Sequence, residues 1–172
     1  MYEIYERGLN QNQAHLHDVD SKILLTHEQR TKARLKVTAE NGEEVRLFLD
    51  HGKSLEVGEY LKTTCGKVVR VDGAIEPVAR AFCDDWHTFA RACYHLGNRH
   101  VKVQVGDLSL RMLPDHVLEE MLLGLGMKVV HEDAVFIPEH GAYHGSGSGH
   151  SHGHGHDHDH HEEKHSHHHG SH

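Results

Sequence analysis

Residues 84–97 read DDWHTFARACYHLG, and this stretch decides the fold of the second half of the chain. Its apolar residues follow the spacing i, i+3, i+4 and i+7 that marks one face of an α-helix, namely Trp86, Phe89, Ala90 and Cys93. Asp84 is a suitable N-cap, and Gly97 is typical of the C′ position just past a helix. We therefore predict a helix that begins after Asp84, ends at Gly97 and buries the Trp86 face.

Extended segments and a second helix surround this one. The predicted strands are Ala74–Cys83, Val101–Val105, Leu108–Met112 and Lys128–Phe136. A second helix begins at Asp115, which follows Pro114, and ends between Gly124 and Gly126. Its apolar face is formed by Val117, Leu118, Met121, Leu122 and Leu125. The order β-α-β-β-α-β is that of the ferredoxin-like fold.

The first half of the chain has the pattern of short β-strands. The predicted strands are Tyr2–Glu6, Lys22–Thr26, Arg34–Ala39, Val45–Leu49 and Lys67–Val71. Asn41-Gly42 separates two alternating runs and predicts a hairpin, and a turn at Asp72-Gly73 is the expected domain boundary. We predict an α+β protein. It has a small all-β domain at 1–73 for peptide or partner binding, a ferredoxin-like domain at 74–140 and a disordered tail at 141–172.

The tail is rich in histidine and poor in apolar residues. Fourteen of the 23 histidines lie between His140 and His172, and no hydrophobic residue follows Tyr143. Such a segment buries too little apolar surface to offset the entropy of ordering it. Neutral imidazole is a good ligand for divalent Ni, Zn and Cu, so the composition predicts metal binding. The expected tail ligands are His140, His144, His150, His152, His154, His156, His158 and His160.

Two plainer interpretations of the tail and one motif match compete with metal binding. A purification tag is usually one run of six histidines, whereas the longest run here is His167–His169. A tail that only improves solubility needs no histidine. The stretch His161–His165 matches the HExxH pattern of zinc metalloproteases, but that chemistry needs a packed helix, so we interpret the match as chance.

Charge and cysteine content limit the class of protein. The net charge of −8 argues against a nucleic-acid partner and suits a protein that concentrates divalent cations. Three cysteines without a CxxC motif indicate neither a disulfide framework nor a zinc ribbon. No signal pattern and no apolar run of about 20 residues occur, so we expect a cytoplasmic protein without a membrane partner.

Two histidines of the folded part are candidate ligands from their positions alone. His100 follows a glycine-containing turn, and His116 lies in the first turn of the second predicted helix. A single histidine is more often structural than ligating, but an adjoining metal-binding tail favours the ligand interpretation for both. The histidines before residue 74 are interpreted as surface residues, namely His15, His17, His27 and His51.

Two segments resemble the UreE family of urease accessory nickel metallochaperones. Residues 92–100, Ala-Cys-Tyr-His-Leu-Gly-Asn-Arg-His, resemble the family signature, and Asp115–Leu122 resembles its helix start. Glu76-Pro77-Val78 is similar to the interdomain strand, and Arg34–Leu49 is similar within the first half. Many members also carry a His-rich tail, so the resemblance covers essentially the whole chain.

This resemblance implies a non-catalytic protein that delivers Ni(II) for assembly of the urease metallocentre. It implies a homodimer through the second domain, in which His100 of both subunits binds nickel. His95 and His116 match secondary metal positions, whereas Pro114 stands where some members carry another histidine. Zn(II) and Cu(II) are further ions that such a site accepts. The implied partners are the urease accessory GTPase and, through it, apo-urease.

Two other functions remain open from the sequence. A storage or detoxification protein would buffer nickel or zinc through its tail. A metallohydrolase would need a three-ligand site with a general base beside it, and no such arrangement is evident in the sequence before the tail.

Overall fold

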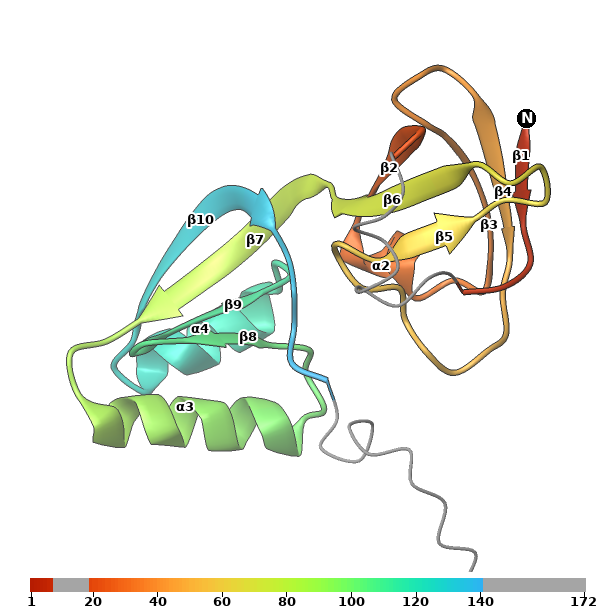
Figure 1. The fold of residues 1–172 in the computed structure, drawn as a ribbon. Coiled ribbons are helices and arrows are strands. Elements are labelled where there is room, and N and C mark those ends of the chain that lie inside the picture. The colour runs from red at the N-terminus through yellow and green to blue at the C-terminus, as the bar shows by residue number, and fades with distance from the viewer. Residues whose placement is uncertain (8–18, 141–172) are drawn as a thin grey trace, which may run out of the picture. The chain divides into compact units, whose positions relative to one another are not determined.

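The computed structural model describes residues 1–7 and 19–140 (Figure 1). Its elements, in chain order, are β1 (Tyr2–Ile4), β2 (Ser21–Leu25), α2 (His27–Arg30), β3 (Arg34–Thr38), β4 (Glu44–Phe48), β5 (Tyr60–Lys62), β6 (Val68–Gly73), β7 (Ile75–Phe82), α3 (Trp86–Asn98), β8 (Gln104–Gly106), β9 (Ser109–Met112), α4 (His116–Gly124) and β10 (Lys128–Val135). The described elements of the first half are strands and the short helix α2, and the second half combines strands with two longer helices. The predicted α+β class is therefore confirmed.

The first half folds as two three-stranded sheets, with orders β1-β4-β3 and β2-β6-β5. Strands β3 and β4 form the predicted antiparallel hairpin, in which Thr38 is paired with Glu44. Gly42 has a φ of 82° in the connection, a conformation that glycine adopts without steric cost. Alternate residues of the strands in both sheets point inward. They form one hydrophobic cluster that includes Ile4, Val45 and Leu61, each 0% exposed.

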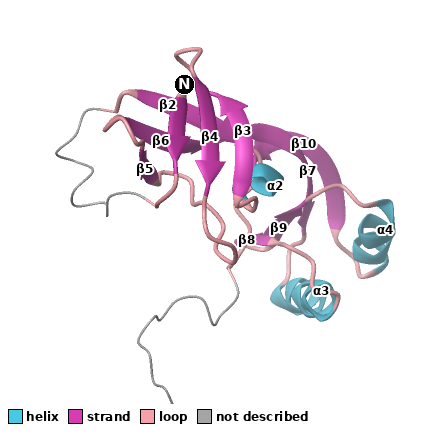
Figure 2. Cartoon of the chain, turned by 90° about the vertical axis from the view of Figure 1, so that its right-hand side faces the viewer, coloured by secondary structure: helices cyan, strands magenta, loops and turns pink. Residues whose placement is uncertain are grey.

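The second half is built on one antiparallel sheet with the order β10-β7-β9-β8. Ala79 and Ala81 of β7 belong to a second hydrophobic cluster together with Leu96 of α3 and Leu122 of α4. Both helices therefore cover the same face of the sheet, and Figure 2 shows them beside it. Since side chains alternate along a strand, Arg80 and Phe82 project from the opposite, open face.

The two predicted helices form, but their details differ from the prediction. The N-cap of α3 is Asp85, whose Oδ1 accepts the Thr88 N–H at 2.8 Å. Hydrogen bonds from the backbone and side chain of Thr88 lower the pKa of the Asp85 carboxyl. Asp84 is instead paired with Lys128. For α4 the predicted cap Asp115 is confirmed, because its Oδ1 accepts from the N–H groups of Val117 and Leu118 at 3.0 Å each.

The predicted buried face of α3 is wrong. Its buried residues are Phe89, Ala92 and Leu96, with Cys93 partly buried against them. These four positions fit the same i, i+3, i+4, i+7 template, anchored at Phe89 instead of Trp86. Trp86 is 65% exposed and only its edge meets Phe89, at 5.7 Å between ring centroids. Ala90 is also exposed.

Other boundaries also differ from the prediction. The Asp72-Gly73 turn is absent, because both residues belong to β6 and pair with Leu24 and Leu25. Gly73 is needed there for a different reason: a Cβ would collide with the side chain of Val135. The strand expected at Val101–Val105 shrinks to β8, which begins only at Gln104. Helix α2 was not predicted, because its four residues carry little periodicity.

No helix within the described residues is long and apolar enough to span a membrane.

Candidate metal site

His100 occupies the position just past the end of α3. Its N–H donates to the Gly97 carbonyl at 2.9 Å, and the Val101 N–H donates to the Leu96 carbonyl at 3.1 Å. This pair of bonds is the Schellman motif, with Arg99 as the C-cap and His100 at C′. The predicted C′ role of Gly97 is therefore wrong, since Gly97 is helical. The φ of His100 is 56°, in the left-handed region that this motif requires.

A histidine at C′ is an unfavourable choice for stability. Left-handed backbone costs a residue with a Cβ about 1–2 kcal/mol, and glycine usually fills this position. The His100 side chain is exposed, and no described hydrogen bond or ion pair engages its ring. The fold therefore carries an imidazole at a strained site without a structural contact that requires it.

Replacing His100 by Gly is expected to stabilise the fold. Relief of left-handed strain outweighs the extra flexibility of glycine in the unfolded chain, so the free energy of unfolding should rise by about 0.5–1 kcal/mol. Urea unfolding of the metal-free protein measures this change. Arg91→Gly, at an exposed position inside α3, is the matched control and should lower the free energy of unfolding by about 1 kcal/mol. A loss of stability in His100→Gly would contradict the strain argument.

The other two predicted ligands of the folded part are His95 and His116. His95 lies near the C-terminal end of α3, and His116 lies at the N-terminal end of α4. His95 is in the last turn of α3, partly buried, and its ring meets Tyr94 edge-on at 5.4 Å between centroids. The His95 carbonyl accepts from the Arg99 guanidinium at 3.1 Å. His116 is exposed and is the first residue of α4, directly after the cap Asp115.

These side chains do not make a complete metal site within one chain. Among residues 1–7 and 19–140, no group of three or more His, Cys, Asp or Glu side chains is arranged to hold a metal ion. His140 is exposed at the end of the described part. The remaining predicted tail ligands lie outside the described residues, namely His144, His150, His152, His154, His156, His158 and His160.

One further histidine has a partner that the sequence did not indicate. His131 of β10 places Nε2 2.9 Å from Oε2 of Glu119 in α4. The other carboxylate oxygen of Glu119 accepts the Asp115 N–H at 3.1 Å. Glu119 therefore links the start of α4 to β10, and this contact gives His131 a structural role.

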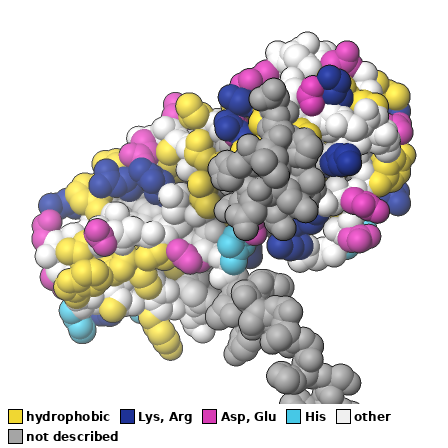
Figure 3. All heavy atoms as spheres, viewed as in Figure 1, with side chains coloured by type: hydrophobic (Ala, Val, Ile, Leu, Met, Phe, Trp, Pro, Cys, Tyr) yellow, Lys and Arg dark blue, Asp and Glu magenta, His cyan; other side chains and the backbone are white. Residues whose placement is uncertain are grey.

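An exposed apolar stripe runs along α3 and leads toward its C-terminal end, where His100 follows. It consists of Trp86, Ala90 and Tyr94, spaced four residues apart, with Trp86 65% and Tyr94 69% exposed. Figure 3 shows hydrophobic side chains gathered on the surface of the second half of the chain, near α3 and α4. Trp86 and Ala90 belong to the face that was predicted to be buried. The i, i+4, i+8 series beside the Phe89 series was the signal for a second apolar face.

Both halves of the chain are similar in sequence to known proteins. Residues 4–74 match the family model described as UreE urease accessory protein, N-terminal domain, and residues 76–172 match the one described as its C-terminal domain. A urease accessory protein UreE of Marinomonas sp. is 59% identical over 148 residues, which cover 84% of this chain and 97% of the relative.

Two further relatives bear the same name. The Alteromonas mediterranea protein is 48% identical over 131 residues, covering 76% of this chain and 85% of the relative. The Vibrio parahaemolyticus protein is 51% identical over 124 residues, covering 72% and 78%. The chain belongs to the UreE family of urease accessory proteins.

Proposed function

We propose that this protein is a nickel metallochaperone, which binds Ni(II) reversibly and delivers it for assembly of the urease metallocentre without catalysing a reaction. Membership of the urease accessory family, with 59% identity across nearly the whole Marinomonas relative, carries this proposal. The donor chemistry agrees with it, since imidazoles suit nickel and hold it less firmly than a cage of thiolates would. Zn(II) and Cu(II) are competing ions for the same donors.

The folded-part metal site is proposed to form between two copies of the chain. Within the described residues no single chain supplies three donors, and a lone exposed imidazole is a weak monodentate ligand. A twofold axis beside the C-terminal end of α3 would bring two His100 side chains together, and two imidazoles on one ion make a stronger site. The strained position of His100 supports this role, because selection for stability alone would favour glycine.

The apolar stripe Trp86, Ala90 and Tyr94 is the proposed dimer contact. Large aromatic side chains dominate the energetics of protein interfaces, and this stripe leads toward His100. Dimerisation through it therefore serves two ends, because it buries exposed apolar surface and pairs the ligands.

Introducing a charge into the stripe should separate the subunits. In Tyr94→Glu an unpaired carboxylate would be buried in the interface at a cost of about 3–5 kcal/mol, which weakens the dimer by about two to four orders of magnitude. Light scattering during size-exclusion chromatography measures the mass. Leu24→Glu adds the same charge at an apolar residue of β2 that is 50% exposed and should remain dimeric. A Tyr94→Glu protein that stays dimeric would rule out this contact.

The proposed function implies a division of the chain into two domains and a His-rich tail. The chain order β7-α3-β8-β9-α4-β10 and the sheet order β10-β7-β9-β8 support a ferredoxin-like metal-binding domain at 74–140. Two separate hydrophobic clusters support an N-terminal partner-binding domain at 1–73. The His-rich tail at 141–172 is proposed to collect nickel in the cytoplasm. The proposed recipients are the accessory GTPase and, through it, apo-urease.

A storage or detoxification protein is the second candidate, and the tail composition favours it. Thirteen histidines follow residue 140, more than a single delivery site needs. The two functions predict different effects of this chain on urease activity in cells. Expression of urease and its other accessory proteins at limiting nickel, with and without this chain, tests the chaperone function. Urease activity should depend on the chain. Equal activity without it, together with lower nickel tolerance, would favour storage.

A further inference from the structure

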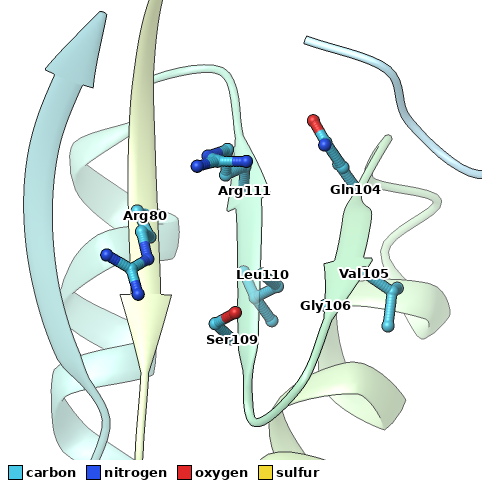
Figure 4. Close-up of a pocket in the computed structure, with 7 residues that line it drawn as sticks. All are labelled: Arg80, Gln104, Val105, Gly106, Ser109, Leu110 and Arg111. Carbon is cyan, nitrogen blue, oxygen red and sulfur yellow. The ribbon is translucent and has the colours of Figure 1, made fainter. Parts of the chain in front are cut away.

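The open face of the four-stranded sheet carries two arginines that are paired across adjacent strands. Arg80 of β7 and Arg111 of β9 are direct neighbours in the antiparallel register. Figure 4 shows them on adjacent strands, with Gln104 on the next strand. Like charges placed directly opposite each other destabilise a strand pair. This pairing therefore needs an explanation outside the stability of the sheet.

Acidic residues near the pair only partly neutralise it. Nε of Arg111 lies 2.6 Å from Oε1 of Glu132 on β10. The Arg80 guanidinium lies over the Phe82 ring, 5.2 Å from its centroid, and no ion pair joins it to an acidic residue in the described part of the chain. Lys128 approaches the same ring at 5.8 Å and is paired with Asp84. Figure 3 shows basic side chains side by side over β7 and β10. In a chain of net charge −8, this face is locally positive.

A pocket of about 260 Å³ lies between these strands (Figure 4), and its polar lining consists of Arg80, Arg111, Gln104 and Ser109. Oε1 of Gln104 already accepts the Ile137 N–H at 3.1 Å, which leaves the amide NH₂ to donate. Guanidinium groups only donate, and the Ser109 hydroxyl is able to donate. The pocket thus offers hydrogen-bond donors from three strands and one unneutralised positive charge.

We infer that this pocket binds an oxyanion, the carboxylate or phosphate group of a small molecule. Arginine forks match carboxylate and phosphate oxygens in a bidentate way, and such charge-assisted hydrogen bonds are the strong ones. The volume lies just below the usual range of about 300–1,000 Å³ for sites that hold drug-sized ligands, so the occupant is small. An anion between Arg80 and Arg111 would offset the repulsion between their positive charges. This site uses none of the proposed metal ligands.

Titration of the ¹⁵N-labelled full-length protein tests the inference by nuclear magnetic resonance. The protein is first freed of metal on a chelating resin, and inorganic phosphate and succinate are then added in separate experiments. At least one of them should shift the amide signals of Gly106, Ser109 and Arg111 in a saturable way. Tighter binding of phosphate would identify phosphate esters as the ligand class, and tighter binding of succinate would identify carboxylates.

Charge variants of the pocket give opposite expected effects. Arg80→Gln should weaken binding about tenfold through loss of charged hydrogen bonds, whereas Glu132→Gln should tighten it because a competing carboxylate is removed. Arg91→Gln, at an exposed arginine of α3, should leave the affinity unchanged. If Arg80→Gln fails to fold, Arg80→Lys keeps the charge and should still weaken binding through loss of the fork. Shifts that do not saturate, or an affinity that no pocket variant changes, would overturn the inference.

Discussion

Nickel-dependent urease activation should fall to the level seen without the accessory protein when His100 is replaced by Ala. The proposed shared site loses both of its central imidazoles at once, because each subunit contributes the same residue. Changes even to residues that only support metal ligands lower metal affinity about 10–100-fold, so loss of two ligands should exceed that. Urease activity in cells grown at limiting nickel measures the effect.

His87→Ala is the matched control for this experiment. His87 is also an exposed histidine of α3, but it lies in the first turn of the helix and outside the predicted ligand set. Its loss should leave activation near the wild-type level. The melting temperature and dimer mass of both variants exclude a folding defect as the cause. Wild-type activation by a folded, dimeric His100→Ala protein would contradict the assigned role of His100.

Removal of residues 141–172 should eliminate most of the nickel that each chain binds while leaving part of its delivery function. The truncation removes 13 of the 23 histidines, all in the tract whose composition predicts metal binding. Nickel bound at saturation should therefore fall by more than half if imidazole count sets the capacity. Equilibrium dialysis with nickel measures capacity, and urease activation in cells measures delivery.

A full-length variant with every histidine after residue 140 replaced by Asn separates loss of ligands from loss of length. It should bind as little nickel as the truncated chain. An unchanged capacity in either variant would show that the tail is not the main reservoir. Complete loss of urease activation after truncation would instead assign delivery to the tail and argue against a shared site at His100.

Much of the fold follows from periodicity in the sequence. The alternating runs around Asn41-Gly42 predicted the β3–β4 hairpin, and Asp115 followed by apolar residues at helical spacing predicted the start of α4. These signals are local, since a hairpin register and a helix cap depend on residues within one or two turns. That is why they are correctly placed without knowledge of the tertiary structure.

The errors arise where tertiary contacts choose between equal local patterns. Helix α3 carries two apolar series, one through Phe89 and one through Trp86, and only the packing of the sheet decides that the Phe89 series is buried. Gly97 was expected to end the helix because glycine usually does, yet His100 takes the left-handed position three residues later. Both departures lie next to the candidate site, and together they expose the aromatic stripe and the imidazole.

The pocket of Arg80 and Arg111 had no sequence signal. The two residues are 31 positions apart, and only the β7–β9 register places them opposite each other. A β-α-β-β-α-β prediction without a register cannot pair individual side chains across strands, because a shift of one residue turns every side chain to the other face. The histidine-rich tail shows the reverse situation, since its metal-binding composition is evident without any structure.

A crystal structure of the full-length protein grown with nickel tests the central claim most directly. The account predicts a dimer in which Trp86 and Tyr94 of both copies are buried near a twofold axis and one nickel ion is bound by two His100 imidazoles. Two copies of His100 that lie far apart, face solvent and bind no nickel would contradict it.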